Sequence, residues 1–152
     1  MRTILFATIS TVTLLTGCAS VPMESADKTQ FARQFNSPSE DTSGLYIYRT
    51  GGPGTALKKD IWVDGKCIGE SAPNTFFYEE VKGGEQHTIS TESEFSPNEL
   101  QVTTDIGSLY FIKQYIKMGV FVGGANVKRV SESEGKKSIS KLQMAVKGTC
   151  SN

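Results

Sequence analysis

The sequence predicts a mainly β fold, a single antiparallel β-sandwich-like domain with one short C-terminal helix. From Gly44 onward, short runs rich in β-branched and aromatic residues are broken by turn residues at close intervals, which is typical of antiparallel sandwiches and barrels. Residues 109–118 are apolar on both faces, as expected of a central strand buried on both sides. The one good helix signal comes late, at residues 131–134.

The first predicted strand spans residues 44–49. Its alternation places Leu45, Ile47 and Arg49 on one face and the two tyrosines on the other. The Gly-Gly-Pro-Gly run at residues 51–54 then forces a loop.

A hairpin is the most clearly marked element of the chain. Asp64-Gly65 separates two apolar runs, and this dipeptide favours a type I′ turn because both central residues must tolerate positive φ. The predicted cross-strand pairs are Val63 with Lys66, Trp62 with Cys67, and Ile61 with Ile68. Cys67 is therefore expected to be a half-buried structural cysteine beside Trp62.

Further strands and a helix complete the domain. The remaining predicted strands are residues 75–81, 86–91, 100–104, 109–118, 125–130 and a closing strand at 142–146. The run from Ser131 to Glu134 fits a capping box. We expect the helix that follows to end near Lys141, although Gly135 weakens it.

The chain divides into three parts. Residues 1–17 read as a signal peptide, with Arg2 near the start and an apolar run too short to span a bilayer. Residues 18–43 are polar and read as a tether, within which residues 27–35 could form a helical turn or two with Phe31 and Phe35 on one side. Residues 44–152 are the predicted β-sandwich-like domain.

Residues 14–18, Leu-Leu-Thr-Gly-Cys, resemble the lipobox of bacterial lipoproteins. This resemblance implies cleavage before Cys18 and acylation of its sulfur and new amino group, with chains such as palmitate. Several acyl chains hold a protein on a membrane where one alone binds reversibly. Ala19 and Ser20 follow instead of an aspartate, which in Gram-negative envelopes implies the outer membrane. Ordinary secretory cleavage beside an unrelated cysteine is the alternative.

Composition excludes several classes of function. The chain carries 16 basic and 16 acidic residues, and removal of the signal with Arg2 leaves the mature part at a formal charge of −1. No basic field is available to hold nucleic acid. With one histidine in the chain, we expect neither a metal site nor a cofactor.

Two cysteines remain once Cys18 carries lipid. Cys67 and Cys150 can form a disulfide in an oxidising compartment. Two unpaired thiols are the alternative, because Cys150 is close to the end of the sequence, where chains are often mobile.

Polar candidates for catalysis each have a structural interpretation. His87 is the one imidazole and titrates near neutral pH, but it shares a strand face with Ile89, which favours packing. Glu92 and Glu94 could form a carboxylate pair for glycoside chemistry or a cation site, yet solvation or bonding to lysines such as Lys113 and Lys117 is the expected outcome.

Aromatic residues and a glycine-rich run are candidates for ligand contact. Trp62, Phe76 and Tyr78, with Phe77 beside them, could stack on sugar rings, while core packing is the competing interpretation. The run at residues 119–124 lacks the lysine of a phosphate-binding loop, so a strand end or bulge is expected there.

The chain resembles a family of bacterial lipoproteins catalogued as domain of unknown function two-eight-four-six. The matching segments are residues 44–49, 63–66, 68–69, 75–77, 87–94, 110–114, 117–119, 130–131 and 134–135. The stretch from Trp62 to Ile89 also resembles the PEGA-type β-modules of cell-envelope proteins. Neither resemblance implies a reaction.

The sequence therefore predicts an outer-membrane lipoprotein that faces the periplasm and acts as a binding or structural module of the envelope rather than as an enzyme. Its expected partners are the membrane, through Cys18, and an envelope protein or glycan. A small periplasmic hydrolase and an accessory subunit of an envelope-spanning assembly are the alternatives.

Overall fold

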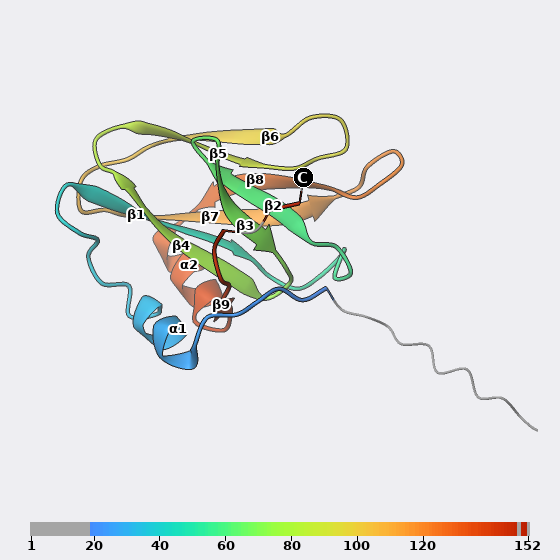
Figure 1. Ribbon diagram of the computed structural model, residues 1–152. Coiled ribbons are helices and arrows are strands. Elements are labelled where there is room, and N and C mark those ends of the chain that lie inside the picture. Colours follow the sequence, from blue (N-terminus) through green and yellow to red (C-terminus); the bar gives the residue numbers. More distant parts are fainter. Residues whose placement is uncertain (1–18, 149, 152) are drawn as a thin grey trace, which may run out of the picture.

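Two β-sheets and two short helices make up the computed structural model, which describes residues 19–148, 150 and 151 (Figure 1). The elements in chain order are α1 (Ala26–Ala32), β1 (Thr42–Arg49), β2 (Lys59–Val63), β3 (Lys66–Ser71), β4 (Thr75–Lys82), β5 (Gln86–Thr91), β6 (Asn98–Thr103), β7 (Leu109–Lys117), β8 (Gly124–Val130), α2 (Glu132–Ile139) and β9 (Gln143–Met144). The predicted signal peptide and Cys18 lie outside the described residues.

The strands form a five-stranded sheet in the order β8-β7-β1-β4-β9 and a four-stranded sheet in the order β3-β2-β5-β6. The predicted mainly β, sandwich-like class is confirmed. The sandwich is not antiparallel throughout, because β1 pairs with β7 and β4 with β9 in parallel. Parallel neighbours need a long crossover, and between β1 and β7 the chain builds the whole four-stranded sheet before it returns.

The five-stranded sheet is buried on both faces. One core cluster lies between the sheets and includes Leu45, Ile47 and Ile61. A second lies between this sheet and the two helices and includes Tyr46 and Phe111. The predicted faces of β1 are therefore confirmed, and the helices add a third layer (Figure 1).

Gly135 permits close packing of α2 on this sheet. A Cβ atom at this position would lie 2.3 Å from the Phe111 ring, so any side chain would push the helix away. The predicted cap is present, since Ser131 Oγ accepts a hydrogen bond of 3.2 Å from the Glu134 amide. The helix ends at Ile139, before the predicted Lys141, and the predicted closing strand shortens to β9.

The segment predicted to be a polar tether instead packs on the sandwich. The Tyr46 hydroxyl donates to the Ala32 carbonyl at 2.7 Å, at the end of α1. Met23 bridges to Ala145. Phe31 and Phe35 do not share a side, because the helix stops at Ala32 and Phe35 adopts a positive φ of 53°; Phe31 is left 65% exposed. The folded body thus includes residues 19–43.

The predicted hairpin is present, with one difference in register. Asp64 and Gly65 have φ values of 51° and 75°, as a type I′ turn requires. Trp62 faces Cys67 as predicted, but Ile61 faces Gly69 instead of Ile68 because the strands are bulged between Ile61 and Trp62. Gly69 has φ 150°, and a Cβ there would lie 3.0 Å from the Phe77 ring.

Within the described part of the chain, no helix is both long and apolar enough to cross a membrane.

Candidate functional site

A groove of about 710 Å³ lies between α1, the segment that follows it, and the outer face of β4. Its floor consists of the Tyr46 and Tyr78 rings, with Ala32 and Met144 beside them and the exposed Phe31 as a wall. The volume falls within the range of small-ligand sites. This groove is the best-formed candidate binding site.

Polar groups stand at one end of the groove. The Tyr78 hydroxyl donates to Glu80 Oε1 at 2.9 Å. The Glu80 carboxylate also accepts from the Ser39 amide at 3.3 Å and from Thr42 Oγ1 at 3.2 Å. It is therefore held in place by donors on three sides.

Burial and these bonds fix the protonation of the groove. Burial, with the nearby Glu80 charge, raises the pKa of Tyr46 to about 12. The pKa of Tyr78 is also raised, by burial and by its bond to Glu80. Burial opposes ionisation of Glu80, but its hydrogen bonds outweigh that effect and lower its pKa. At neutral pH the groove thus presents two neutral tyrosine hydroxyls and the Glu80 carboxylate. Asp27 and Lys28 also belong to its lining, so acidic side chains outnumber basic ones there, which suits a neutral or cationic amphiphile.

The three aromatic residues proposed for ligand contact do not form one surface. Tyr78 lines the groove. Phe76 shares its strand face but is fully buried in the core under the helices. Trp62 lies on the other sheet, opposite Cys67. The prediction that these three residues could contact one ligand together is therefore wrong. Strand alternation indicates which face of a strand a side chain occupies, but not the sheet to which that strand belongs.

His87 is 5% exposed and occupied on both ring nitrogens. Nδ1 lies 2.7 Å from Asp64 Oδ2, and Nε2 lies 2.8 Å from the Lys82 carbonyl oxygen. Both partners accept, so both nitrogens donate only in the imidazolium form. Burial lowers the pKa of His87, but these bonds outweigh it and raise the pKa above its usual 6.5. The His87 ring thus connects the Asp64-Gly65 turn to the end of β4.

Glu92 and Glu94 have separate structural partners. Glu92 pairs with Lys59 at 3.2 Å. Glu94 accepts from the Val120 amide at 2.6 Å, the Val122 amide at 3.2 Å, and the Phe121 amide. The expected bonds to Lys113 and Lys117 are not the ones formed, because the loop that follows β7 folds back over Glu94. That loop contains the glycine-rich run, and Met118, predicted to be in a buried strand, is 97% exposed there.

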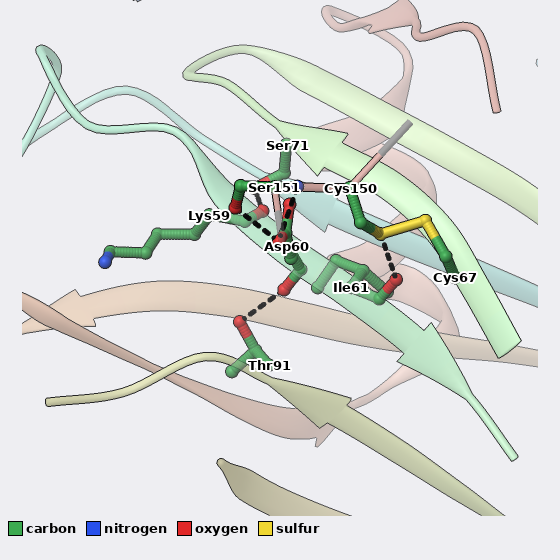
Figure 2. Close-up of a disulfide and its surroundings, with 8 residues drawn as sticks. All are labelled: Lys59, Asp60, Ile61, Cys67, Ser71, Thr91, Cys150 and Ser151. Carbon is green, nitrogen blue, oxygen red and sulfur yellow. Dashed lines mark hydrogen bonds between the residues drawn. A yellow bond between two sulfur atoms is a disulfide. The ribbon is translucent and has the colours of Figure 1, made fainter. Parts of the chain in front are cut away.

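Cys67 and Cys150 form a disulfide with a Cα–Cα distance of 6.1 Å (Figure 2). The disulfide alternative predicted from the sequence is therefore the one observed. Next to it, the Ser151 amide and hydroxyl donate to Asp60 Oδ2 at 3.0 and 2.6 Å. These contacts fix the C-terminal segment to the outer face of β2.

Sequence reasoning missed Asp60 and Glu80 as site residues. Asp60 is 1% exposed, and burial raises its pKa against the opposing effect of the Ser151 bonds. No local pattern marks either acid, because the partners of Asp60 and Glu80 come from Ser151 and from Ser39 and Thr42, far away in the sequence. No group of three potential metal ligands occurs in the described portion of the chain.

Comparison with known proteins gives a family and a relative. A family model described as Protein of unknown function (DUF2846) matches residues 39–125. An uncharacterized protein of Haemophilus influenzae (strain ATCC 51907 / DSM 11121 / KW20 / Rd) is 59% identical over 138 residues, which are 91% of this chain and 82% of that protein. No solved structure matches the chain.

Proposed function

The chain belongs to the DUF2846 family of proteins of unknown function, and we propose that it is an outer-membrane lipoprotein that binds a small amphiphilic ligand in the cell envelope. The groove beside α1 is the observation that carries the binding role. Its floor is apolar, and its lining has two acidic side chains, Asp27 and Glu80, against one basic side chain, Lys28, which fits a neutral or cationic amphiphile better than an anion.

The proposed location at the outer membrane is inferred from the residues around Cys18 and is supported by the disulfide. Lipidation at Cys18 and sorting by Ala19-Ser20 are inferred from the sequence. A disulfide between Cys67 and Cys150 suits an exported protein, because such bonds persist in oxidising compartments.

The alternatives receive less support. A hydrolase would depend on His87 or on the Glu92 and Glu94 pair, and each of these side chains is already bonded within the fold. An accessory subunit of an envelope assembly remains the second proposal, and it shares the same address.

Lipidation is tested by Cys18→Ser in cells fed a palmitate analogue. We expect the wild-type protein to take up the label and to fractionate with the outer membrane, and the variant to lose the label because its acyl sites are gone. A label retained by Cys18→Ser would refute attachment at this residue.

The groove is tested with N-phenylnaphthylamine, a neutral apolar probe that fluoresces when it leaves water. Asn36 lines the groove and is exposed, so Asn36→Trp should fill it and weaken binding by about tenfold, equivalent to about 1.4 kcal/mol. Ser133→Trp, on an exposed turn of α2, is the matched control. Equal probe binding by both variants would remove the groove as the site.

A further inference from the structure

Apolar side chains gather on two loops at one end of the sandwich. The loops are residues 92–97, between β5 and β6, and residues 118–123, between β7 and β8. Their exposed fractions are 97% for Met118, 84% for Phe121, 79% for Phe95, 75% for Val120 and 59% for Val122. These five are the majority of the nine large hydrophobic side chains exposed in the described residues. Such clustering marks an interaction surface.

The loop that carries most of them is held in shape by Glu94. Three consecutive amides, of residues 120–122, donate to its carboxylate. Gly119 permits the tight turn, since a Cβ there would lie 1.7 Å from the Val122 carbonyl oxygen. Backbone donors that are satisfied internally can leave water at low cost. The amides of residues 120–122 are already satisfied by Glu94, so moving this loop out of water would not leave them without a partner.

Few charged residues lie on the loops at this end of the molecule. The loop between β1 and β2, residues 50–58, contains Lys58, the loop between β5 and β6 contains Glu92 and Glu94, and the loop between β7 and β8 contains none. Lys117 flanks the loops and is exposed, whereas Lys58 pairs with Glu70 at 2.7 Å. Long basic side chains at the edge of an apolar surface reach the headgroup level of a bilayer.

The same end holds the start of the described chain. The Ala19 amide donates to the Thr55 carbonyl at 3.1 Å. The 50–58 loop in turn meets the β7–β8 region, where a Cβ on Gly54 would lie 2.9 Å from Ile116 and one on Gly123 2.9 Å from Leu57. Figure 1 shows the three loops and the N-terminal segment at this end. Cys18 directly precedes Ala19, and consecutive Cα atoms are about 3.8 Å apart.

We propose that this end, which we call the Ala19 end, inserts Met118, Val120, Phe121 and Phe95 into the lipid surface to which Cys18 is attached. The inference rests on the proposed lipid attachment and adds an orientation to it. Because the chain is packed on the domain from Ala19 onward, only a short connection separates Cys18 from this end. Acyl chains on Cys18 would therefore hold these apolar side chains against the bilayer.

The test places tryptophan at each end of the sandwich in turn. Residues 19–151 contain both sheets and both helices, so the chain beginning at Cys18 is coupled through its thiol to a maleimide lipid in phosphatidylethanolamine–phosphatidylglycerol vesicles. In a Trp62→Phe background, Phe121→Trp reports on the Ala19 end. Ile106→Trp, an apolar position 59% exposed at the opposite end, is the matched control.

We expect brominated lipids to quench the fluorescence of the Phe121→Trp variant several-fold more than that of the Ile106→Trp variant, with a blue shift at position 121 alone. Equal quenching, or a spectrum at position 121 unchanged from that in solution, would overturn the proposal. A blue shift without vesicles, together with sedimentation as a dimer, would also overturn it, because a second copy would then cover the loops.

Chemical coupling separates this test from that of the proposed function. The cell's own lipidation is measured by the palmitate label, whereas the vesicle experiment supplies the anchor regardless of that result. A palmitate-labelled protein whose Phe121→Trp variant is not quenched would refute the orientation alone, and an unlabelled protein would refute the attachment alone.

Discussion

The two ends of the sandwich are built from the same strands, but the loops at each end are held by different hydrogen bonds. The end opposite Ala19, which we call the Asp64 end, comprises residues 37–41, 64–65, 83–85 and 104–108, and these loops carry five acidic residues. They are joined by partly buried bonds, including those from His87 to Asp64 and to the Lys82 carbonyl. The Ala19 end relies on Glu94, at the surface, to hold the loop that carries most of its apolar tips. The neighbouring 50–58 loop at the Ala19 end is held by the buried Arg49, which donates to the Leu57 and Gly54 carbonyls at 2.7 and 2.6 Å. The difference between the ends therefore concerns the 118–123 loop, whose shape depends on a surface carboxylate.

The largest effect is expected from His87→Ala at the Asp64 end. The variant loses the hydrogen bonds to Asp64 and to the Lys82 carbonyl, which keeps only its longer bond of 3.4 Å from Thr104 Oγ1. This loss should lower the free energy of unfolding by roughly 1–3 kcal/mol. Chemical denaturation measures the change, with Thr88→Ala, on a half-exposed position of the same strand, as control. If the variant accumulates and folds, it should still complement a deletion strain. Failure to complement under those conditions would give His87 a direct role and revive the hydrolase proposal.

The hairpin turn gives the second effect at that end. Nothing lies within 4 Å of a Cβ built on Gly65, so Gly65→Val is strained by its positive φ alone. We expect a loss of roughly 1–2 kcal/mol and a smaller loss for Gly65→Asn, which tolerates this region of φ. Thermal melts of both variants decide the point. Equal melting midpoints for valine and wild type would contradict the left-handed conformation.

The pH dependence of the free energy of unfolding should show that His87 stabilises the Asp64 end. Its pKa is raised in the folded state, so its stabilisation is fully present below the unfolded value of about 6.5 and is lost as pH rises through the folded value. The wild type should therefore be more stable near pH 6 than near pH 9. His87→Gln should flatten this part of the profile, and an unchanged slope would show that another group is responsible.

The smallest global effect is expected from Glu94→Gln at the Ala19 end. The carboxylate holds an exposed loop and supports neither core cluster. The melting midpoint should stay unchanged while the amides of residues 120–122 exchange faster with deuterium. Glu92→Gln is the control, because its partner is Lys59. A fall in midpoint as large as that of His87→Ala would erase the difference between the ends.

Local patterns predicted much of the fold. The faces of β1 and the Asp64-Gly65 turn follow from alternation and from residues that tolerate positive φ, both of which act over a few neighbouring residues. The parallel pairing of β1 with β7 depends on the path of the chain through the second sheet, so no local pattern contains it. The packing of α1 likewise depends on Tyr46, which lies beyond the segment that looked like a tether.

The candidate site was less predictable than the fold. Tyr78 was named from the aromatic run, but Glu80 acquires its role through Ser39 and Thr42, which precede it in the chain by 41 and 38 residues. Hydrophobicity placed Met118 inside, although the loop turns it out. Alternation assumes that apolar residues seek the protein's own core, and that assumption fails where a surface is kept for something else.

The disulfide has a consequence for how the chain reaches its final covalent state. The chain contains three cysteines, which allow three pairings, and Cys67 must wait for a partner 83 residues later. During that interval an unmodified Cys18 would compete for it. Acylation of the Cys18 sulfur, as proposed, removes this competitor and leaves one intramolecular pairing. The modification that attaches the protein to the membrane would thus also prevent the wrong disulfide from forming.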